Sequence, residues 1–246
     1  MPKQGEIDYL KNIGKEGVNH ASNKPYSDEN CGKYFMDLGV VFQLLPPPPA
    51  KLLDLGCGTG WTSCIFAKRG YEVTGQDIAA DMIDCANSNK ERERIANIKF
   101  IVSDYEDMRF DSEFDCAVFY DSLHHAVNEE TALKMVYKAL KPGGICVAVE
   151  PGKNHDKNSI SQNAVNKYGV TEKAMHPGKV VKLSKKIGFS GYKIFPRIIH
   201  IGKAIYDRPD RPALKLIFKL GILRSLAAIY IILFRKKSHG ITLLVK

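Results

Sequence analysis

The stretch "LLDLGCGTGW", residues 52–61, decides the fold of this 246-residue chain. A short apolar run leads into three glycines at alternate positions, and a helical pattern begins at Trp61. Glycines let the backbone turn tightly and leave no Cβ where a ligand must approach. The N-terminus of the following helix presents free N–H groups and a partial positive charge. The stretch therefore predicts a strand, a tight turn and a helix that face a ligand with an anionic group.

The spacing of the glycines argues against a dinucleotide site. A dinucleotide fingerprint ends in glycine or alanine at the position where this chain has Trp61. A buried carboxylate at Asp54 would disfavour a phosphate, but it could orient backbone amides or accept hydrogen bonds from an ammonium group. These residues indicate a zwitterion that carries a carboxylate and an amine. An ordinary strand–helix turn stays open as the reading of the glycines taken alone.

Short apolar runs alternate with helical stretches after Lys51, which is the pattern of βαβ units and a parallel sheet. We predict one doubly wound α/β domain over 1–246, with a mostly parallel seven-stranded sheet. It comprises an N-terminal helical cap over 1–45, a cofactor-binding core over 50–152 and a basic, apolar insert over 199–238. The predicted strands are 51–56, 72–77, 98–104, 114–121, 144–150, 189–198 and 239–246.

The composition favours a cytoplasmic protein. The six cysteines contain no C-x-x-C pair, so they predict neither a zinc site nor a disulfide framework. The first residues lack the apolar stretch of a secretory signal, and no segment offers 18 uninterrupted apolar residues.

The net charge of +9 is concentrated near the C-terminus. Residues 198–246 hold 10 of the 36 basic residues but only 2 of the 27 acidic ones. This asymmetry predicts an anionic partner for the tail. Three readings of the insert stay open: helices that pack on the sheet edge, an interfacial segment on anionic membrane over 213–237, or a transmembrane anchor. Few aromatic residues are interleaved with these charges, which argues against a nucleic-acid partner.

The run from Leu52 to Trp61 resembles the first motif of the class I S-adenosylmethionine-dependent methyltransferases, and the resemblance continues in order over roughly residues 50–152. Asp77 stands where that family places an acid on the ribose hydroxyls, and Asp104 where it places a carboxylate on the adenine amino group. The resemblance implies S-adenosylmethionine as cofactor and S-adenosylhomocysteine as product. The expected cofactor-binding residues are Asp54, Gly56, Cys57, Gly58, Gly60, Asp77, Ile78, Asp104, Tyr105, Tyr120 and Asp121.

The motif "FYDSLHHAV", residues 119–127, follows the fourth predicted strand, where the family brings the methyl group against its acceptor. A histidine there could take a proton from a hydroxyl acceptor. His124, His125 and Glu150 are therefore the candidate catalytic residues. A purely structural role for the histidines stays open. We expect no metal, because adjacent residues diverge and no third ligand is spaced nearby.

The resemblance implies methyl transfer to a small-molecule, glycan or lipid-linked acceptor. Oxygen is the expected target, since "YDSL" stands where amino-methylating enzymes carry Asn/Asp-Pro-Pro-Tyr. Methylation of a nucleic acid and a non-catalytic, cofactor-binding scaffold are the alternatives. The region 17–30, which contains His20 and Tyr26, is expected to form a lid. The oligomeric state and the acceptor's identity are left undecided by the sequence.

Overall fold

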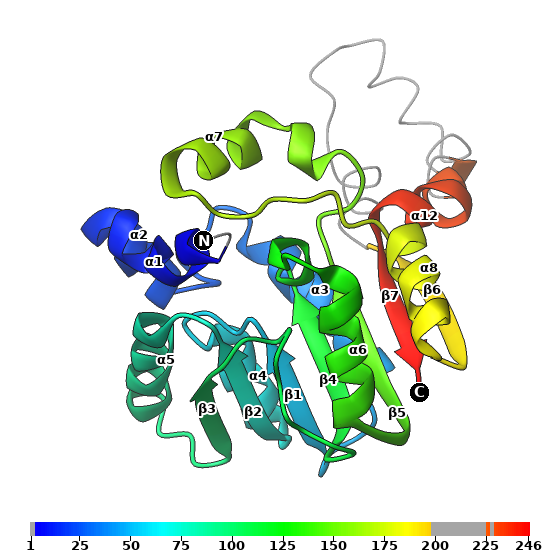
Figure 1. Ribbon diagram of the computed structural model, residues 1–246, viewed down its shortest axis with the longest axis horizontal. Coiled ribbons are helices and arrows are strands. Elements are labelled where there is room, and N and C mark those ends of the chain that lie inside the picture. The colour runs from blue at the N-terminus through cyan, green and yellow to red at the C-terminus, as the bar shows by residue number, and fades with distance from the viewer. Residues whose placement is uncertain (1–2, 198–224, 227–228) are drawn as a thin grey trace.

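A computed structural model describes residues 3–197, 225–226 and 229–246 of the chain (Figure 1). Its centre is a seven-stranded sheet in the order β3-β2-β1-β4-β5-β7-β6. All pairings from β3 to β5 are parallel, whereas β7 runs antiparallel to both of its neighbours. The strands are β1 (Lys51–Leu55), β2 (Glu72–Asp77), β3 (Ile98–Val102), β4 (Phe114–Tyr120), β5 (Leu140–Val149), β6 (Gly191–Pro196) and β7 (Gly240–Val245).

All seven predicted strands are present, and the prediction of a doubly wound, mostly parallel sheet is confirmed. The largest difference in bounds lies in β5, which begins at Leu140 instead of 144. Leu140 pairs with Phe114, but the next pair joins Ile145 to Cys116, so the register shifts there. The extra residues form a bulge, which a period-two pattern does not reveal.

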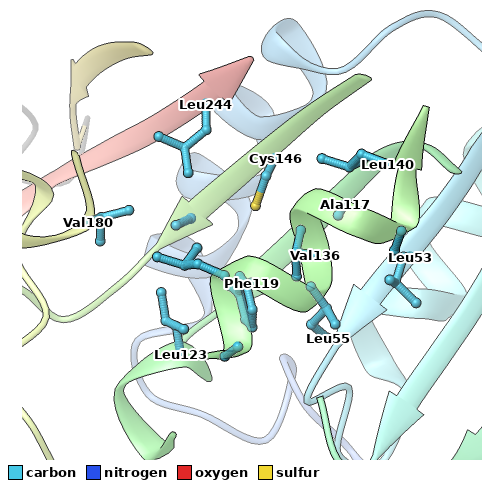
Figure 2. Close-up of a cluster of buried hydrophobic side chains, with 14 of the residues drawn as sticks. Leu53, Leu55, Ala117, Phe119, Leu123, Val136, Leu140, Cys146, Val180 and Leu244 are labelled. Carbon is cyan, nitrogen blue, oxygen red and sulfur yellow. The ribbon is translucent and has the colours of Figure 1, made fainter. Parts of the chain in front are cut away.

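Helices cover both faces of the sheet, which explains why its central strands are apolar on both sides. Leu53, Leu55, Ala117 and Phe119 pack against α6 and α8 on one face (Figure 2). The intervening residues of β1 and β4 pack against α3 and α4 on the other. The helices that flank the sheet are α3 (Cys31–Leu44), α4 (Trp61–Arg69), α5 (Ala80–Arg92), α6 (Glu129–Ala139) and α8 (Pro177–Ile187).

Three helices gather beyond the carboxyl ends of the strands; the first two lie within the helical cap predicted over 1–45, and the third was not predicted. They are α1 (Gln4–Asn12), α2 (Gly14–Ser22) and α7 (Ser159–Tyr168). The rings of Tyr9 and Tyr168 meet edge to face, with centroids 5.4 Å apart. At Gly5, a Cβ would lie 2.0 Å from the carbonyl oxygen of Gly169, so only glycine permits this close approach of α1. Figure 1 shows α1, α2 and α7 together above the sheet.

Most of the predicted insert over 199–238 lies outside the described residues. Within it, residues 225–226 and 229–230 are helical, followed by a π-helical turn η3 (Ile231–Arg235) and the short helix α12 (Lys236–His239). Among the described helices, none combines the length and the apolar character that a membrane span requires.

Candidate active site

The glycine turn links β1 to α4 and lies against the loop that follows β4. Gly56 has a φ of +65°, and a Cβ there would lie 2.7 Å from the Cβ of Ser122. The neighbouring Cys57 is buried, and its N–H donates to the carbonyl oxygen of Gln76 at 2.9 Å. Burial raises the pKa of the Cys57 thiol, which is therefore neutral. The backbone of Gly56 thus lies directly against the loop that follows β4, with no side chain between them.

Asp54 lies beneath this turn. Its Oδ2 accepts hydrogen bonds from the hydroxyls of Thr62 and Ser63, both at 2.6 Å. Burial raises the pKa of Asp54 to about 6, although these two hydrogen bonds oppose the shift. The side chain is 1% exposed and lines neither of the cavities described below. Its observed contacts fasten β1 to the first turn of α4.

Two acids lie at the carboxyl ends of the next strands along the sheet: Asp77 is the last residue of β2, and Asp104 lies two residues after β3. Asp77 accepts the N–H groups of Gly58 at 2.9 Å and of Ala79 at 3.0 Å, and burial raises its pKa. Asp104 accepts the N–H of Glu106 at 2.8 Å and forms an ion pair with Lys3, just before α1. Both carboxylates therefore stand at the edge where the cap meets the sheet.

Two cavities open at this edge, between the strand ends and the cap. The first, of about 280 Å³, is lined by Lys3, Glu6, Tyr9, Lys24, Gly56, Asp77, Ile78, Met82, Asp104, Tyr105, Glu106, Asp121, Ser122, His125, Ala164, Val170 and Glu172. The second, of about 370 Å³, is lined by Tyr9, Ile13, Gly17, His20, Ala21, Lys24, Tyr34, Gly56, Cys57, Gly58, Thr59, Trp61, Met82, Tyr120, Asp121 and Tyr168. Gly56 and Asp121 line both, so the two cavities adjoin at the glycine turn.

The cavities collect most of the predicted cofactor residues. Of the eleven, only Asp54 and Gly60 line neither cavity. At Gly60, glycine is required by packing in the core, because a Cβ there would lie 2.6 Å from the Cζ atom of Phe100. In the expected lid, His20 lines the second cavity, whereas the side chain of Tyr26 is 77% exposed.

Asp121 combines an unusual backbone conformation with an unpaired side-chain oxygen. Its φ is +47°, in the left-handed region that non-glycine residues rarely adopt. Its Oδ1 is buried and has no hydrogen-bond partner among the described residues. A buried, unpaired carboxylate oxygen is costly unless a ligand donates to it. Asp121 thus has acceptor capacity that no described residue uses, and the residue lines both cavities.

Glu150 holds the histidine loop in place and does not line either cavity. Its Oε1 accepts the N–H of Leu123 at 2.9 Å, and its Oε2 lies 2.8 Å from Nδ1 of His124. Burial raises the pKa of Glu150 to about 8, and burial together with the charge of His125 lowers the pKa of His124 to about 3. His124 is therefore neutral, and its Nε2 points toward Glu172 at 3.6 Å.

His125 is the histidine that reaches the first cavity. Its Nδ1 lies 2.6 Å from the carbonyl oxygen of Thr171 and 3.3 Å from Oε1 of Glu6. Burial opposes protonation, but the hydrogen bond and charge of Glu6, with the charge of Glu172, outweigh it and raise the pKa to about 9. The two adjacent histidines thus have opposite protonation preferences.

The fold also brings a third metal-ligating group to the histidine pair. Ligand atoms of His124, His125 and Glu172 lie within 4.8 Å of one another. The expectation that the adjacent rings diverge and that no third ligand is near was wrong, since their centroids are 4.0 Å apart and the loop after α7 supplies Glu172. Glu172 is already paired with Nε2 of His155 at 2.5 Å.

Sequence reasoning missed the cap and loop residues of the site, chiefly Glu6, Tyr9 and Glu172. Each lies far along the chain from the motifs, and none belongs to a recognisable pattern. Glu6 is placed by its hydrogen bond from the N–H of Thr171 at 2.6 Å. Only the packing of α1 against α7 brings these groups to the strand ends.

Comparison with known proteins identifies the core. Residues 53–148 match the family model described as a methyltransferase domain. Residues 53–148 form a class I methyltransferase domain. It includes the last three residues of β1, all of β4, the glycine turn and both candidate histidines.

Curated relatives of the domain span several activities. The ubiquinone biosynthesis O-methyltransferase of Coxiella burnetii is 34% identical over 94 residues, 38% of this chain and 40% of the relative. The S-adenosyl-L-methionine-dependent Diels-Alderase iccD of Talaromyces variabilis is 27% identical over 168 residues, 63% of this chain and 58% of the relative. The chain thus spans between 40% and 58% of the length of these relatives.

Solved structures share the fold of the methyltransferase domain and its flanking helices. Phosphoethanolamine N-methyltransferase 2 of Haemonchus contortus, in complex with S-adenosyl-L-methionine, has a TM-score of 0.68 at 18% identity, over 97% of this chain and 59% of that one. The [4+2]-cyclase SpnF has a TM-score of 0.58 at 18% identity, over 88% and 81%.

Proposed function

We propose that the chain transfers a methyl group from S-adenosylmethionine to an oxygen atom of a small-molecule acceptor. The observation that carries the proposal is that His125 lines the same cavity as six of the eleven predicted cofactor residues, among them Asp77, Asp104 and Asp121. The family supports the cofactor, and the position of His125 supports a proton acceptor beside it.

The residues present fit this cofactor. Gly56 leaves bare backbone at the junction of the two cavities, and the unpaired Oδ1 of Asp121 suits the ammonium group of the methionine part. Asp77 offers two carboxylate oxygens for the ribose hydroxyls, and Asp104 one for the adenine amino group. When bound, S-adenosylmethionine supplies a methyl group on a sulfonium with a neutral leaving group.

His125 would remove the acceptor's proton through Nε2. Because a carbonyl oxygen can only accept, the short contact to Thr171 requires the proton of the neutral ring on Nδ1. That leaves the Nε2 lone pair to take a proton. A sulfonium cation nearby would lower the pKa of His125 from its raised value and favour this neutral form.

In this proposal His124 and Glu150 act as positioning residues. Glu150 accepts N–H groups from the loop and orients the His124 ring, while His124 packs against the ring of His125. The site therefore uses Glu150 to hold the loop and not as a rival base.

The enclosure of the site supports a small acceptor. Residues of α1 and α7, such as Tyr9 and Ala164, line the first cavity on the side away from the sheet. A glycan or a lipid-linked molecule could present one hydroxyl there, whereas a nucleic acid would need the cap to move aside.

Direct measurement of methyl transfer tests the proposal. Full-length protein is incubated with radiolabelled S-adenosylmethionine and a panel of hydroxylated and aminated small molecules, and S-adenosylhomocysteine is quantified. Acceptor-dependent product formation is expected. Tight binding of S-adenosylhomocysteine without transfer to any acceptor would contradict the proposal. That result would favour a scaffold, or an activity such as the S-adenosyl-L-methionine-dependent Diels-Alderase named for iccD or the [4+2]-cyclase named for SpnF.

A further inference from the structure

The segment that leads into β7 exposes a run of apolar side chains. Of the 13 exposed large apolar side chains among the described residues, six lie between 226 and 234. They are Leu226, Ile229, Tyr230, Ile232, Leu233 and Phe234. Soluble monomers rarely expose such a contiguous apolar patch unless it binds something.

Five of these side chains follow helical spacing. In the sequence, Leu226, Ile229, Tyr230, Leu233 and Phe234 stand at positions i, i+3, i+4, i+7 and i+8, which is the apolar spacing of an amphipathic helix. The rings of Tyr230 and Phe234 lie 5.5 Å apart, as expected of neighbours on such a face. Phe234 is 64% exposed and Tyr230 is 61% exposed. These five side chains, called the apolar stripe below, are therefore exposed, whereas such a face normally packs against a core.

Positive charge adjoins the stripe. Arg235, Lys236 and Lys237 follow it directly, and the sequence has no acidic residue after Asp210. Within the described parts of the chain, none of these three forms an ion pair with a carboxylate. An apolar face next to unpaired basic side chains matches the boundary between acyl chains and anionic headgroups.

The segment is fixed to the sheet at the edge that carries the site. Ile241 of β7 pairs with Val149, the last residue of β5, so α12 lies beyond the carboxyl end of β5. The carbonyl oxygen of Ser238 accepts the N–H of Lys153 at 2.9 Å. Figure 1 shows α12 at the same end of the sheet as α7.

We propose that Leu226 and residues 229–237 form a membrane-docking surface for anionic lipid, which holds the cavity side of the domain toward a bilayer surface. The apolar stripe would enter the headgroup region, and the basic residues would contact the lipid phosphates. This surface is independent of the proposed methyl transfer, because it requires neither cofactor nor acceptor.

Vesicle sedimentation of the full chain, without cofactor, tests the surface. We expect binding to phosphatidylcholine vesicles that contain about 30% phosphatidylglycerol at low salt, and little binding to phosphatidylcholine alone. Raising the salt from about 50 to about 500 mM should release much of the protein. Equal binding to both lipids, or no binding to anionic vesicles at low salt, would overturn the proposal, and neither result requires a variant.

Matched variants locate the surface. The triple change Arg235→Gln, Lys236→Gln and Lys237→Gln should weaken binding by about 10- to 100-fold, and Phe234→Ser should weaken it severalfold. The charge control is Lys99→Gln, Lys134→Gln and Lys138→Gln, and the apolar control is Ile160→Ser, whose side chain is 81% exposed. Neither control should change binding.

Three results would contradict the assignment to this segment. One is an equal loss of binding in the control and in the tail variant. A second is a stronger affinity for single-stranded RNA than for anionic vesicles at the same salt. The third is a dimer in gel filtration that Phe234→Ser converts to monomer, which would assign the stripe to a second copy of the chain. Unchanged thermal unfolding of each variant shows that it is folded.

Discussion

Oε1 of Glu6, on the first helix of the cap, lies 3.3 Å from Nδ1 of His125, on the loop after β4. The same carboxylate oxygen accepts the N–H of Thr171, so one acid ties the cap to both walls of the first cavity. The cap therefore completes the electrostatic surroundings of the histidine that we propose as the base.

Replacing Glu6 by glutamine should make His125 more acidic. Glutamine can still accept the N–H of Thr171, but it removes the negative charge that helps raise the pKa of His125 to about 9. Glu172, His124, Asp77 and Glu150 face or influence the same ring and remain. The acid limb of kcat against pH should move down by about one unit. Glu16→Gln, on the exposed part of α2, is the control, and an unmoved limb in Glu6→Gln would contradict the coupling.

Removing the imidazole of His125 should slow transfer without weakening cofactor binding. His125→Asn should lower kcat by about 10²–10⁴-fold if Nε2 takes the acceptor's proton. His176→Asn is a suitable control, because His176 caps α8 through a side-chain acceptor that asparagine also provides. Turnover is measured with the identified acceptor, and affinity for S-adenosylhomocysteine by calorimetry. Near-normal turnover with an unchanged pH profile would assign His125 to a structural role.

Neutralising Asp121 should weaken binding of the cofactor's ammonium group. Asparagine tolerates the observed φ of +47°, so Asp121→Asn should fold, but it lacks the charge of the unpaired Oδ1. We expect affinity for S-adenosylhomocysteine to fall by about 10- to 100-fold. Asp84→Asn, an exposed change on α5, should leave it unaltered. Equal affinities in calorimetry would show that Asp121 faces another ligand or none.

Alanine variants of Gly60, in the glycine turn, and of Gly143, in β5, separate the cost of backbone strain from the cost of close packing. Gly60 and Gly143 both have a φ of +76°, but an added Cβ meets Phe100 and Ala86 only at Gly60. Gly143→Ala should cost about 1–2 kcal/mol of unfolding free energy from strain alone. Gly60→Ala should cost about 1–3 kcal/mol more, because the core must also shift. Urea unfolding measures both, and equal losses would mean that the contact at Gly60 is absent.

Asp54 should make the fold less stable as the pH rises from about 4 to 6. Its pKa is raised to about 6 in the folded chain from 3.8 when unfolded, so between these values the folded state holds a proton that the unfolded state has lost. A shift of this size corresponds to about 3 kcal/mol. Asp54→Asn should remove much of this pH dependence in urea unfolding at pH 4.5 and 7.5, whereas Asp84→Asn should keep it. An unchanged dependence in Asp54→Asn would show that the buried carboxyl does not titrate in this window.

The sequence alone determined the central sheet, because that part of the fold rests on local patterns. Apolar runs such as Leu52–Leu55 and Phe114–Tyr120 must be buried on both faces, and helical stretches between them force a parallel order. The glycine turn and the acids Asp77 and Asp104 were predictable for the same reason, since each lies at or within two residues of the end of its strand.

Only the tertiary structure decided which side chains meet at the acceptor end. Glu6, Glu172 and His125 are separated by up to 166 residues, and their encounter depends on α1 packing against α7. Likewise, adjacent histidines look equivalent in the sequence, but burial and the charge of His125 keep His124 neutral, while Glu6 favours a charged His125. Local periodicity determines strands and turns, whereas the charge of a buried group depends on neighbours that only the folded chain assembles.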